Sequence, residues 1–263
     1  MRIFFAGCEK ETFQDIAYKQ GVRDILLSFY WNKGIGLKEE KEKGFNVFLD
    51  SGGYSARKKG VNVNVQDYGR FLEQNKDYIE MAANLDVMDI NKALENQKYL
   101  EQFYPVLPVY HYSEYVEQKK DLMEEFCKKY EIVAVGGIAG MEINRKILRN
   151  FLNYCFRTAI KYKRKVHGFG ITSLELLKNY PFYTVDSTAW LVGGKFGMIL
   201  KWLPEFKMKT TIHYSQKEKM LQDNIPVKLI EKYQERLIHN VREMLKMEQM
   251  VTKLWRIRGV KYD

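Results

Sequence analysis

Short apolar runs alternate along this chain with longer stretches in which apolar residues recur every three or four positions. The short runs are typical of buried β-strands, and the longer stretches are typical of amphipathic helices. Eight runs predict strands, namely Ile3–Ala6, Ile25–Ser28, Asn46–Leu49, Met81–Leu85, Val106–Tyr110, Ile132–Val135, Val166–Phe169 and Tyr183–Val185. The clearest helices between them are expected at Val65–Asn75, Ile90–Gln102, Ser113–Lys129 and Ile143–Lys163. Because eight alternating strands are the number needed to close a parallel barrel, the pattern predicts an α/β protein with a (β/α)8 TIM-like barrel.

Hydroxyl residues stand at the expected start of two helices, where they are favoured as caps of backbone N–H groups. One is Ser113, and the others are Thr172 and Ser173. The interval between the seventh and eighth strands has room for only a turn or two of helix, so we expect that unit to be shortened.

The pattern changes after Asp186. Residues Gly193–Gly197 predict a flexible loop, and the segment to about Gln222 is expected to be irregular. Apolar positions from Pro226 to Ile257 then follow a helical spacing and predict a long helix packed on the barrel, with a coiled-coil dimer as the alternative. We therefore expect a single domain overall, with a barrel over residues 1–222 and a C-terminal helical extension over residues 223–263.

Composition narrows the class of protein and its partners. The 263 residues contain no apolar stretch of about 20 residues, so no membrane span is expected, and three separated cysteines favour a reducing cytoplasm over a disulfide framework. No cysteine or histidine has the spacing of a metal site, so neither a metal nor a cofactor is expected. The net charge of +10 favours a polyanionic partner, and nucleic acid is the first candidate, although a general surface bias would give the same charge.

Two acids end expected strands and carry the chemistry that we predict. Asp50 is followed by Gly52 and Gly53, and Asp186 lies at the end of the last strand. Such carboxylates lie at one end of a barrel, where a pair of them can break a glycosidic bond. The alternative is structural, with each acid capping a helix or pairing with a lysine. The catalytic interpretation requires residues 50 and 186 to face one common cavity.

Other residues at the same end suggest how a nucleobase would be bound. Asp86 could accept hydrogen bonds from the Watson–Crick edge of guanine, and glycines could let a flat ring approach the backbone. Aromatic side chains could stack on the base, and basic side chains could contact phosphates. The candidate base-binding residues are Asp86, Gly52, Gly53, Tyr54, Tyr110, His111, Gly136, Gly137, Phe169 and Gly170, and the candidate phosphate contacts are Arg57, Lys58, Lys59 and Lys195.

Taken together, these motifs resemble the tRNA-guanine transglycosylase family, including its branch that modifies DNA in phage and bacterial 7-deazaguanine systems. Residues 50–54 are similar to the family's Asp-Ser-Gly-Gly-Phe-Gln motif, whose Asp is a general acid/base. Asp86 matches a guanine-recognising acid, residues 136–138 resemble a base-binding Gly-Gly-Leu loop, and residues 168–170 resemble a glycine loop under the base. Asp186 stands where the family carries its nucleophile.

The family's zinc-binding Cys-x-Cys-x-x-Cys motif is absent from this chain. Ser55 replaces a glutamine, and residues 188–195 replace an arginine-bearing loop. The resemblance therefore implies the compact, zinc-less branch that acts on DNA, in the cytoplasm of the host if a phage encodes the chain. It also implies a free 7-deazaguanine base as second substrate, and helper proteins of a DNA-modification system as partners.

The resulting hypothesis is base exchange, in which Asp186 attacks C1′ of a guanosine and Asp50 transfers protons to and from the bases. A transglycosylase acting on tRNA and a non-catalytic nucleic-acid-binding barrel are the two main alternatives. A simple sugar hydrolase is a weaker one, because the positive charge of the chain disfavours it.

Overall fold

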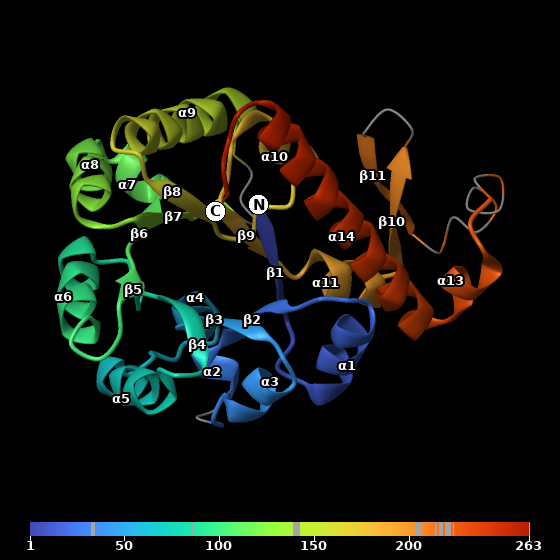
Figure 1. Cartoon of the computed structure of the whole chain (residues 1–263), viewed down its shortest axis with the longest axis horizontal. Helices are drawn as coiled ribbons and strands as arrows, with labels where there is room; N and C mark the ends of the chain where they lie inside the picture. The colour runs from blue at the N-terminus through green and yellow to red at the C-terminus, as the bar shows by residue number, and fades with distance from the viewer. Residues whose placement is uncertain are drawn as a thin grey trace.

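The computed structural model describes residues 1–32, 35–85, 87–138, 143–203, 207–213, 215, 218, 222 and 224–262. In these residues a parallel sheet curls into a barrel that helices surround (Figure 1). Its strands are β1 Arg2–Ala6, β2 Asp24–Ser28, β3 Asn46–Asp50, β4 Ile79–Ala83, β5 Val106–Leu107, β6 Val109–His111, β7 Ile132–Gly136, β8 Lys165–Gly168 and β9 Thr184–Ser187. The surrounding helices are α1 Glu11–Lys19, α2 Phe29–Asn32, α3 Lys38–Glu42, α4 Gly53–Lys58, α5 Val65–Asn75, α6 Ile90–Leu100, α7 Tyr112–Val116, α8 Lys120–Lys129, α9 Arg145–Lys161, α10 Leu174–Asn179 and α11 Ala189–Lys195. The predicted (β/α)8 barrel is thereby confirmed.

Nine strands appear where eight were predicted, because Pro108 interrupts the fifth. The sheet order is β5-β4-β3-β2-β1-β9-β8-β7-β6, so the two edge strands are the two halves of the segment Val106–His111. Proline has no N–H to donate to a ladder, and it is tolerated where pairing changes partner. Here β5 pairs with β4, β6 pairs with β7, and the Pro108 carbonyl accepts the Ala134 N–H at 2.9 Å. One kinked strand therefore closes the barrel.

The helix predicted over Ser113–Lys129 is wrong in its continuity. Gln118, with φ of 62°, separates α7 from α8, and the Lys119 N–H turns back to the Glu114 carbonyl at 2.9 Å. The N-cap of α7 is His111 rather than Ser113, and Ser173 caps α10 without a side-chain hydrogen bond. The short α10 confirms the shortened unit between the last two barrel strands.

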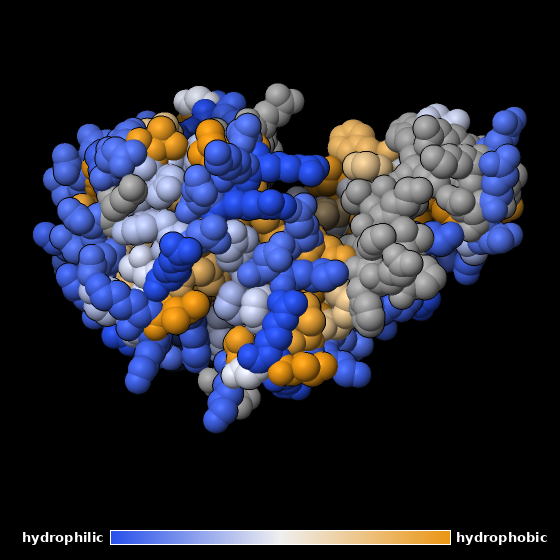
Figure 2. All heavy atoms as spheres, turned by 90° about the horizontal axis from the view of Figure 1, so that it is seen from above, coloured by the Kyte–Doolittle hydropathy of each residue, from blue (hydrophilic) through white to orange (hydrophobic). Residues whose placement is uncertain are grey.

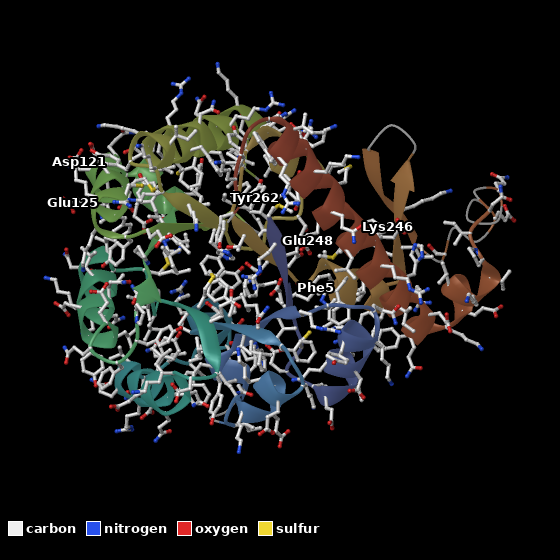
Figure 3. The ribbon with its side chains drawn as sticks, viewed as in Figure 1. Phe5, Asp121, Glu125, Lys246, Glu248 and Tyr262 are labelled. Carbon is white, nitrogen blue, oxygen red and sulfur yellow. The ribbon has the colours of Figure 1, made fainter. Side chains whose placement is uncertain are left out.

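Two hydrophobic cores follow from the alternation of side chains along each strand. One lies between the strands and the helices and includes Phe5 of β1, which is labelled in Figure 3. The other fills the barrel and consists of Phe4, Ala6, Leu26, Phe48, Met81 and Ala83, with Leu107 and Phe169 packed against it. Three free cysteines, Cys8, Cys127 and Cys155, are buried.

The segment after β9 differs from the predicted flexible and irregular chain. Gly193 and Gly194 lie within α11, and a Cβ on Gly194 would stand 2.5 Å from the tip of the Leu237 side chain, so glycine lets this leucine pack closely against the helix. An antiparallel hairpin of β10 Met198–Leu203 and β11 Lys207–His213 follows. Asn240 of the long C-terminal helix holds this hairpin, since its side chain accepts the Leu200 N–H at 2.9 Å.

The C-terminal helix packs on the barrel as predicted, but it is divided at Lys232 into α13 Val227–Glu231 and α14 Tyr233–Ile257. Its apolar stripe is fully buried within the chain at Leu237, Val241, Met244, Met247 and Val251. This stripe is therefore used inside the molecule. Figure 1 shows α14 crossing the barrel beside the N-terminal end of β1, with the hairpin and α13 to one side of the barrel, and Figure 2 shows a face of the barrel on which hydrophilic side chains predominate. None of the described helices is long and apolar enough to cross a membrane.

Candidate active site

The nucleophile predicted at residue 186 lies inside the barrel. Asp186 pairs in register with Phe4 of the interior core, and its side chain is on the same side of β9 as that core. It is 8% exposed. The Gly170 N–H donates to Asp186 Oδ1 at 2.9 Å, and no hydrogen bond from the described residues reaches Oδ2. One carboxylate oxygen is therefore held, whereas the described residues give the other no hydrogen bond.

His167 lies directly beside this carboxylate. Its Nε2 is 3.4 Å from Asp186 Oδ1 without the alignment of a hydrogen bond, and its Nδ1 is 2.9 Å from Thr184 Oγ1. The ring is fully buried, and it meets Phe48 and Phe169 edge to face at centroid distances of 4.7 and 4.5 Å. His167 was not among the predicted site residues, although its position two residues before Phe169 on the same strand face was readable from the alternation.

Asp50 also lies on the interior side of its strand, two residues beyond the interior Phe48. Its Oδ2 accepts the Gly52 N–H at 2.9 Å, which fixes the turn into α4. Gly52 has a φ of 76°, and a Cβ there would stand 2.3 Å from Ser28 Oγ and 2.5 Å from Tyr30 Cβ. Gly52 is thus needed first for the close approach of the neighbouring β2–α2 turn. Gly53 is buried at the start of α4.

The two carboxylates face the same interior from strands separated by β2 and β1. Three strand spacings amount to about 14 Å along the barrel wall, and inward-pointing side chains shorten the distance between the carboxyl groups. Asp50 lies nearer the C-terminal opening than Asp186, since Asp186 is level with Phe4, Phe4 contacts Phe48, and Asp50 lies beyond Phe48. Both carboxylates therefore lie on the inner side of the barrel wall, at different depths.

A histidine–glutamate pair stands at the end of β6. His111 Nδ1 is 3.3 Å from Glu114 Oε1, and Glu114 also accepts the His111 N–H in a capping box. Gly136 pairs with His111, and a Cβ on Gly136 would stand 3.3 Å from its Nε2. Gly137, with φ of 71°, lies against the His111 Cβ. The two glycines therefore make room for the histidine ring.

The assignment of Tyr110 as a base-binding residue is wrong, because its side chain points away from the barrel interior. It is fully buried against α9, with its ring stacked on Phe151 at a centroid distance of 5.9 Å. Burial also raises the pKa of its hydroxyl. Alternation explains the difference, since the interior positions of β6 are Val109 and His111. Phe169 does lie inside, above His167, and Gly170 reaches Asp186 as described.

Asp86 lies outside the described residues, as do Ala139 and Gly140 of the glycine loop after β7. The base-reading role predicted for Asp86 stays a prediction.

The predicted phosphate contacts occupy two places near the same end of the barrel. Arg57, Lys58 and Lys59 belong to α4 and its C-cap, directly after Asp50. Lys195 ends α11, where its Nζ lies 4.9 Å from the centroid of the Phe13 ring. All four follow strands at their C-terminal ends, where ligands bind in barrels of this type.

Glu9 is an acid at this end that was not among the predicted site residues. It follows β1, and the Ser28 N–H donates a hydrogen bond to its carboxylate. Burial raises the pKa of Glu9, whereas its backbone hydrogen bonds and Lys195 oppose that shift. An acid three residues after a strand end was a readable signal, but no glycine pair accompanied it. In the described residues, no group of three or more His, Cys, Asp and Glu could hold a metal ion.

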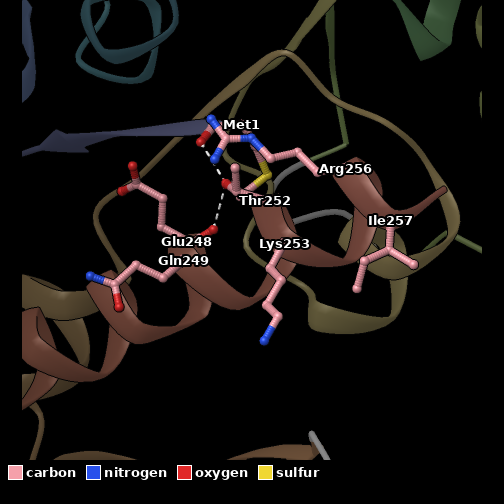
Figure 4. Close-up of a pocket in the computed structure, with 7 residues that line it drawn as sticks. All are labelled: Met1, Glu248, Gln249, Thr252, Lys253, Arg256 and Ile257. Atoms are coloured by element: carbon pink, nitrogen blue, oxygen red, sulfur yellow. Dashed lines mark hydrogen bonds between the residues drawn. The ribbon is translucent and has the colours of Figure 1, made fainter. Parts of the chain in front are cut away.

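A separate hollow opens at the opposite end of the barrel, between Met1 and the C-terminal half of α14 (Figure 4). Met1, Glu248, Thr252 and Arg256 line it, and the Thr252 hydroxyl donates to the Met1 carbonyl at 3.0 Å. Figure 3 shows Glu248 near β1, whereas Lys246 points outward. Because this hollow lies away from the strand ends that carry the acids, we do not assign catalysis to it.

We expect the free energy of unfolding to depend on pH through the carboxyl group of Glu248. Burial is the largest cause that raises the pKa of its carboxyl to about 7, Asp24 adds to the shift, and the Met1 amino group and Arg2 oppose it. Between the ordinary pKa and about 7 the unfolded chain releases a proton that the folded chain keeps, so this group costs stability as pH rises. We expect Glu248→Gln to remove about 2 kcal/mol or less of that loss, after allowance for partial solvent access.

Urea unfolding at pH 5 and pH 8 measures the effect. The free energy of unfolding should fall less between these pH values in Glu248→Gln than in the wild type. Glu231→Gln, at an exposed position of α13, is the control and should behave as the wild type. Equal pH slopes in all three proteins would contradict the assignment.

Comparisons with known proteins bear on the fold alone. No family model matches the chain, and no curated protein matches it. Among solved structures, a candidate fructose-1,6-biphosphate aldolase from Coccidioides immitis has a TM-score of 0.57 at 10% identity and covers 96% of this chain and 91% of its own. A structure from Aquifex aeolicus VF5 has a TM-score of 0.48 at 10% identity and covers 94% and 91%. At this identity the likeness to the first of these structures shows the fold alone, a TIM barrel.

Proposed function

We propose that the protein is a guanine transglycosylase, which exchanges guanine in DNA for a 7-deazaguanine base through a covalent glycosyl–aspartate intermediate. The observation that carries the proposal is the asymmetric Asp186 carboxylate, with Oδ1 held by the Gly170 N–H and Oδ2 without a hydrogen bond from the described residues. A nucleophile needs such an oriented oxygen. The motif resemblance supplies the identity of the bases.

In the first step Asp186 Oδ2 attacks C1′ of the target nucleotide, and the bond from C1′ to N9 of guanine breaks. The electron pair of that bond stays on N9, which receives a proton from the Asp50 carboxyl group. In the second step Asp50 takes the N9 proton of the incoming 7-deazaguanine, N9 attacks C1′, and the bond to Asp186 breaks. Two inversions give net retention at C1′.

The surroundings of the two acids support this division of roles. Asp186 is the deeper and more buried, as a covalent intermediate protected from water requires. Asp50 lies nearer the opening, where bases enter and leave. We expect His111, which Glu114 orients, to contact the edge of the base, and Phe169 to contact its face.

Incubation of the protein with guanine-labelled DNA and RNA, with a 7-deazaguanine base present, tests the proposal. Release of label from DNA supports it. Release from RNA alone favours the tRNA-acting alternative. Binding with a steep salt dependence but without release identifies a non-catalytic nucleic-acid-binding barrel.

Asp50→Asn separates proton transfer from covalent attack. We expect exchange to slow by about 10²- to 10⁴-fold, because general acid–base catalysis contributes that much. The amide oxygen can still accept the Gly52 N–H, so the turn should persist. Exchange is measured as the release of label. The covalent adduct is measured by denaturing electrophoresis and should still be detected.

Asp77→Asn, at an exposed turn before β4, is the matched control and should exchange at the wild-type rate. Unchanged exchange in Asp50→Asn would remove Asp50 from the mechanism.

A further inference from the structure

Two exposed aromatic rings stand beside the turn that holds Asp50. Trp31 of α2 is 42% exposed and Tyr54 of α4 is 55% exposed, although large aromatic side chains are usually buried. The two helices are in contact, and Figure 1 shows them close together at the barrel. Both rings are therefore available to a partner on the same face as the candidate active site.

A lysine accompanies each ring. Lys58 Nζ lies 4.5 Å from the centroid of Tyr54, and Lys59 Nζ lies 4.2 Å from that of Trp31. Lys59 belongs to the end of α4 and Trp31 to α2, so this contact bridges the two helices. We call Trp31, Tyr54, Lys58 and Lys59 the α2–α4 patch.

Close contacts join the patch to the turn that carries Asp50. Trp31 packs against Tyr30 at a centroid distance of 5.0 Å, and Tyr30 fits against Gly52, which leaves no room for a Cβ. The Gly52 N–H donates to Asp50. Contacts from Trp31 through Tyr30 and Gly52 therefore connect the patch to the candidate general acid/base. A hollow lies beside the patch, and its lining includes Tyr30, Asn62, Asn64, Gln74 and the ion pair of Asp67 with Arg70.

We propose that the α2–α4 patch binds an unpaired nucleic-acid strand next to the nucleotide whose base is exchanged. Exposed rings offer faces on which bases stack, and ammonium groups beside them offer counter-charges for phosphates. A duplex hides its base faces and cannot use the rings. The proposal rests on the proposed function for the identity of the neighbouring site, but not for binding itself.

The test uses a labelled single-stranded oligonucleotide that contains only thymidine, so that no guanine is available for exchange. Binding is followed by fluorescence anisotropy with the full chain. The double variant Trp31→Ala, Tyr54→Ala should bind at least about tenfold more weakly than the wild type, since stacking on one ring alone is worth that factor. A duplex of equal length should bind equally to both proteins.

Tyr18→Ala is the matched control. Tyr18 is also 42% exposed and also lies beside a cation, with the Arg23 guanidinium 4.0 Å from its ring centroid. It lies near the end of α1, at the opposite end of the barrel, and should leave binding unchanged. Thermal unfolding of each variant shows whether the fold is kept.

Lys58→Gln with Lys59→Gln tests the phosphate contacts separately. The slope of log K against log salt should become shallower by about 1.4, since each phosphate contact with a single strand contributes about 0.7. The aromatic variant should keep the wild-type slope.

Equal binding of the thymidine strand by wild type and aromatic variant overturns the proposal, as does an equal loss in Tyr18→Ala. If the aromatic variant loses binding to anionic vesicles but keeps strand binding, the proposal is also overturned, in favour of a membrane. If exchange is never observed but the aromatic variant loses strand binding, the proposed function fails and the patch remains.

Discussion

Asp186→Asn should abolish base exchange. The amide oxygen can replace the held carboxylate oxygen as acceptor of the Gly170 N–H, so the loop after β8 should keep its position. The electron pair of the amide nitrogen is delocalised into the carbonyl, so this nitrogen cannot attack C1′ as a carboxylate oxygen does. We expect a loss of about 10⁴-fold or more, the range found when a nucleophile is removed from a catalytic unit.

Two measurements check this result. Label release from guanine-labelled DNA should fall to background, and the covalent adduct seen with the wild type on denaturing electrophoresis should disappear. Asp15→Asn, at an exposed position of α1, should retain exchange. Wild-type turnover by Asp186→Asn would refute the covalent mechanism.

Trp190→Ala should be the most destabilising single change that we consider. The indole is fully buried between α11 and the barrel, close to Phe5 and Phe13, with both centroids 6.2 Å away. Its Nε1 donates to the Ala6 carbonyl at 3.0 Å. Removal leaves a cavity and an unpaired acceptor, which together cost about 3–5 kcal/mol.

Urea unfolding of the wild type and variant gives the difference directly. Trp190→Phe retains most of the side-chain volume but loses the hydrogen bond. Its free energy of unfolding should lie between those of the wild type and Trp190→Ala. Trp31→Ala removes an exposed indole and should stay within about 0.5 kcal/mol of the wild type. A small effect of Trp190→Ala would mean that α11 is not held by this contact.

The position of Trp190 also links stability to the candidate site. It follows the strand that carries Asp186, and its hydrogen bond joins α11 to the end of β1, the strand paired with β9. Loosening this contact should therefore reduce exchange in addition to stability.

The barrel was predictable because a buried strand is a local signal. The helix Val65–Asn75 was predicted to the residue, since Asn64 caps it through hydrogen bonds to the N–H groups of Gln66 and Asp67. The split at Pro108 was missed because the pattern of apolar residues continues through it. The helical state of Gly193 and Gly194 was missed because glycine pairs usually mark loops, and the residue that packs against Gly194, Leu237, is distant in sequence.

By itself the amino-acid order determined which segments become strands and that two acids end them, because burial on a strand demands an apolar run and its end admits polar groups. Only the tertiary structure decided which groups meet. Pairing of β8 with β9 brings His167 to Asp186, and the turn after β8 aims the Gly170 N–H at the same oxygen. Closure of the barrel turned Tyr110 outward and His111 inward, since neighbouring positions on a strand face opposite sides of its wall.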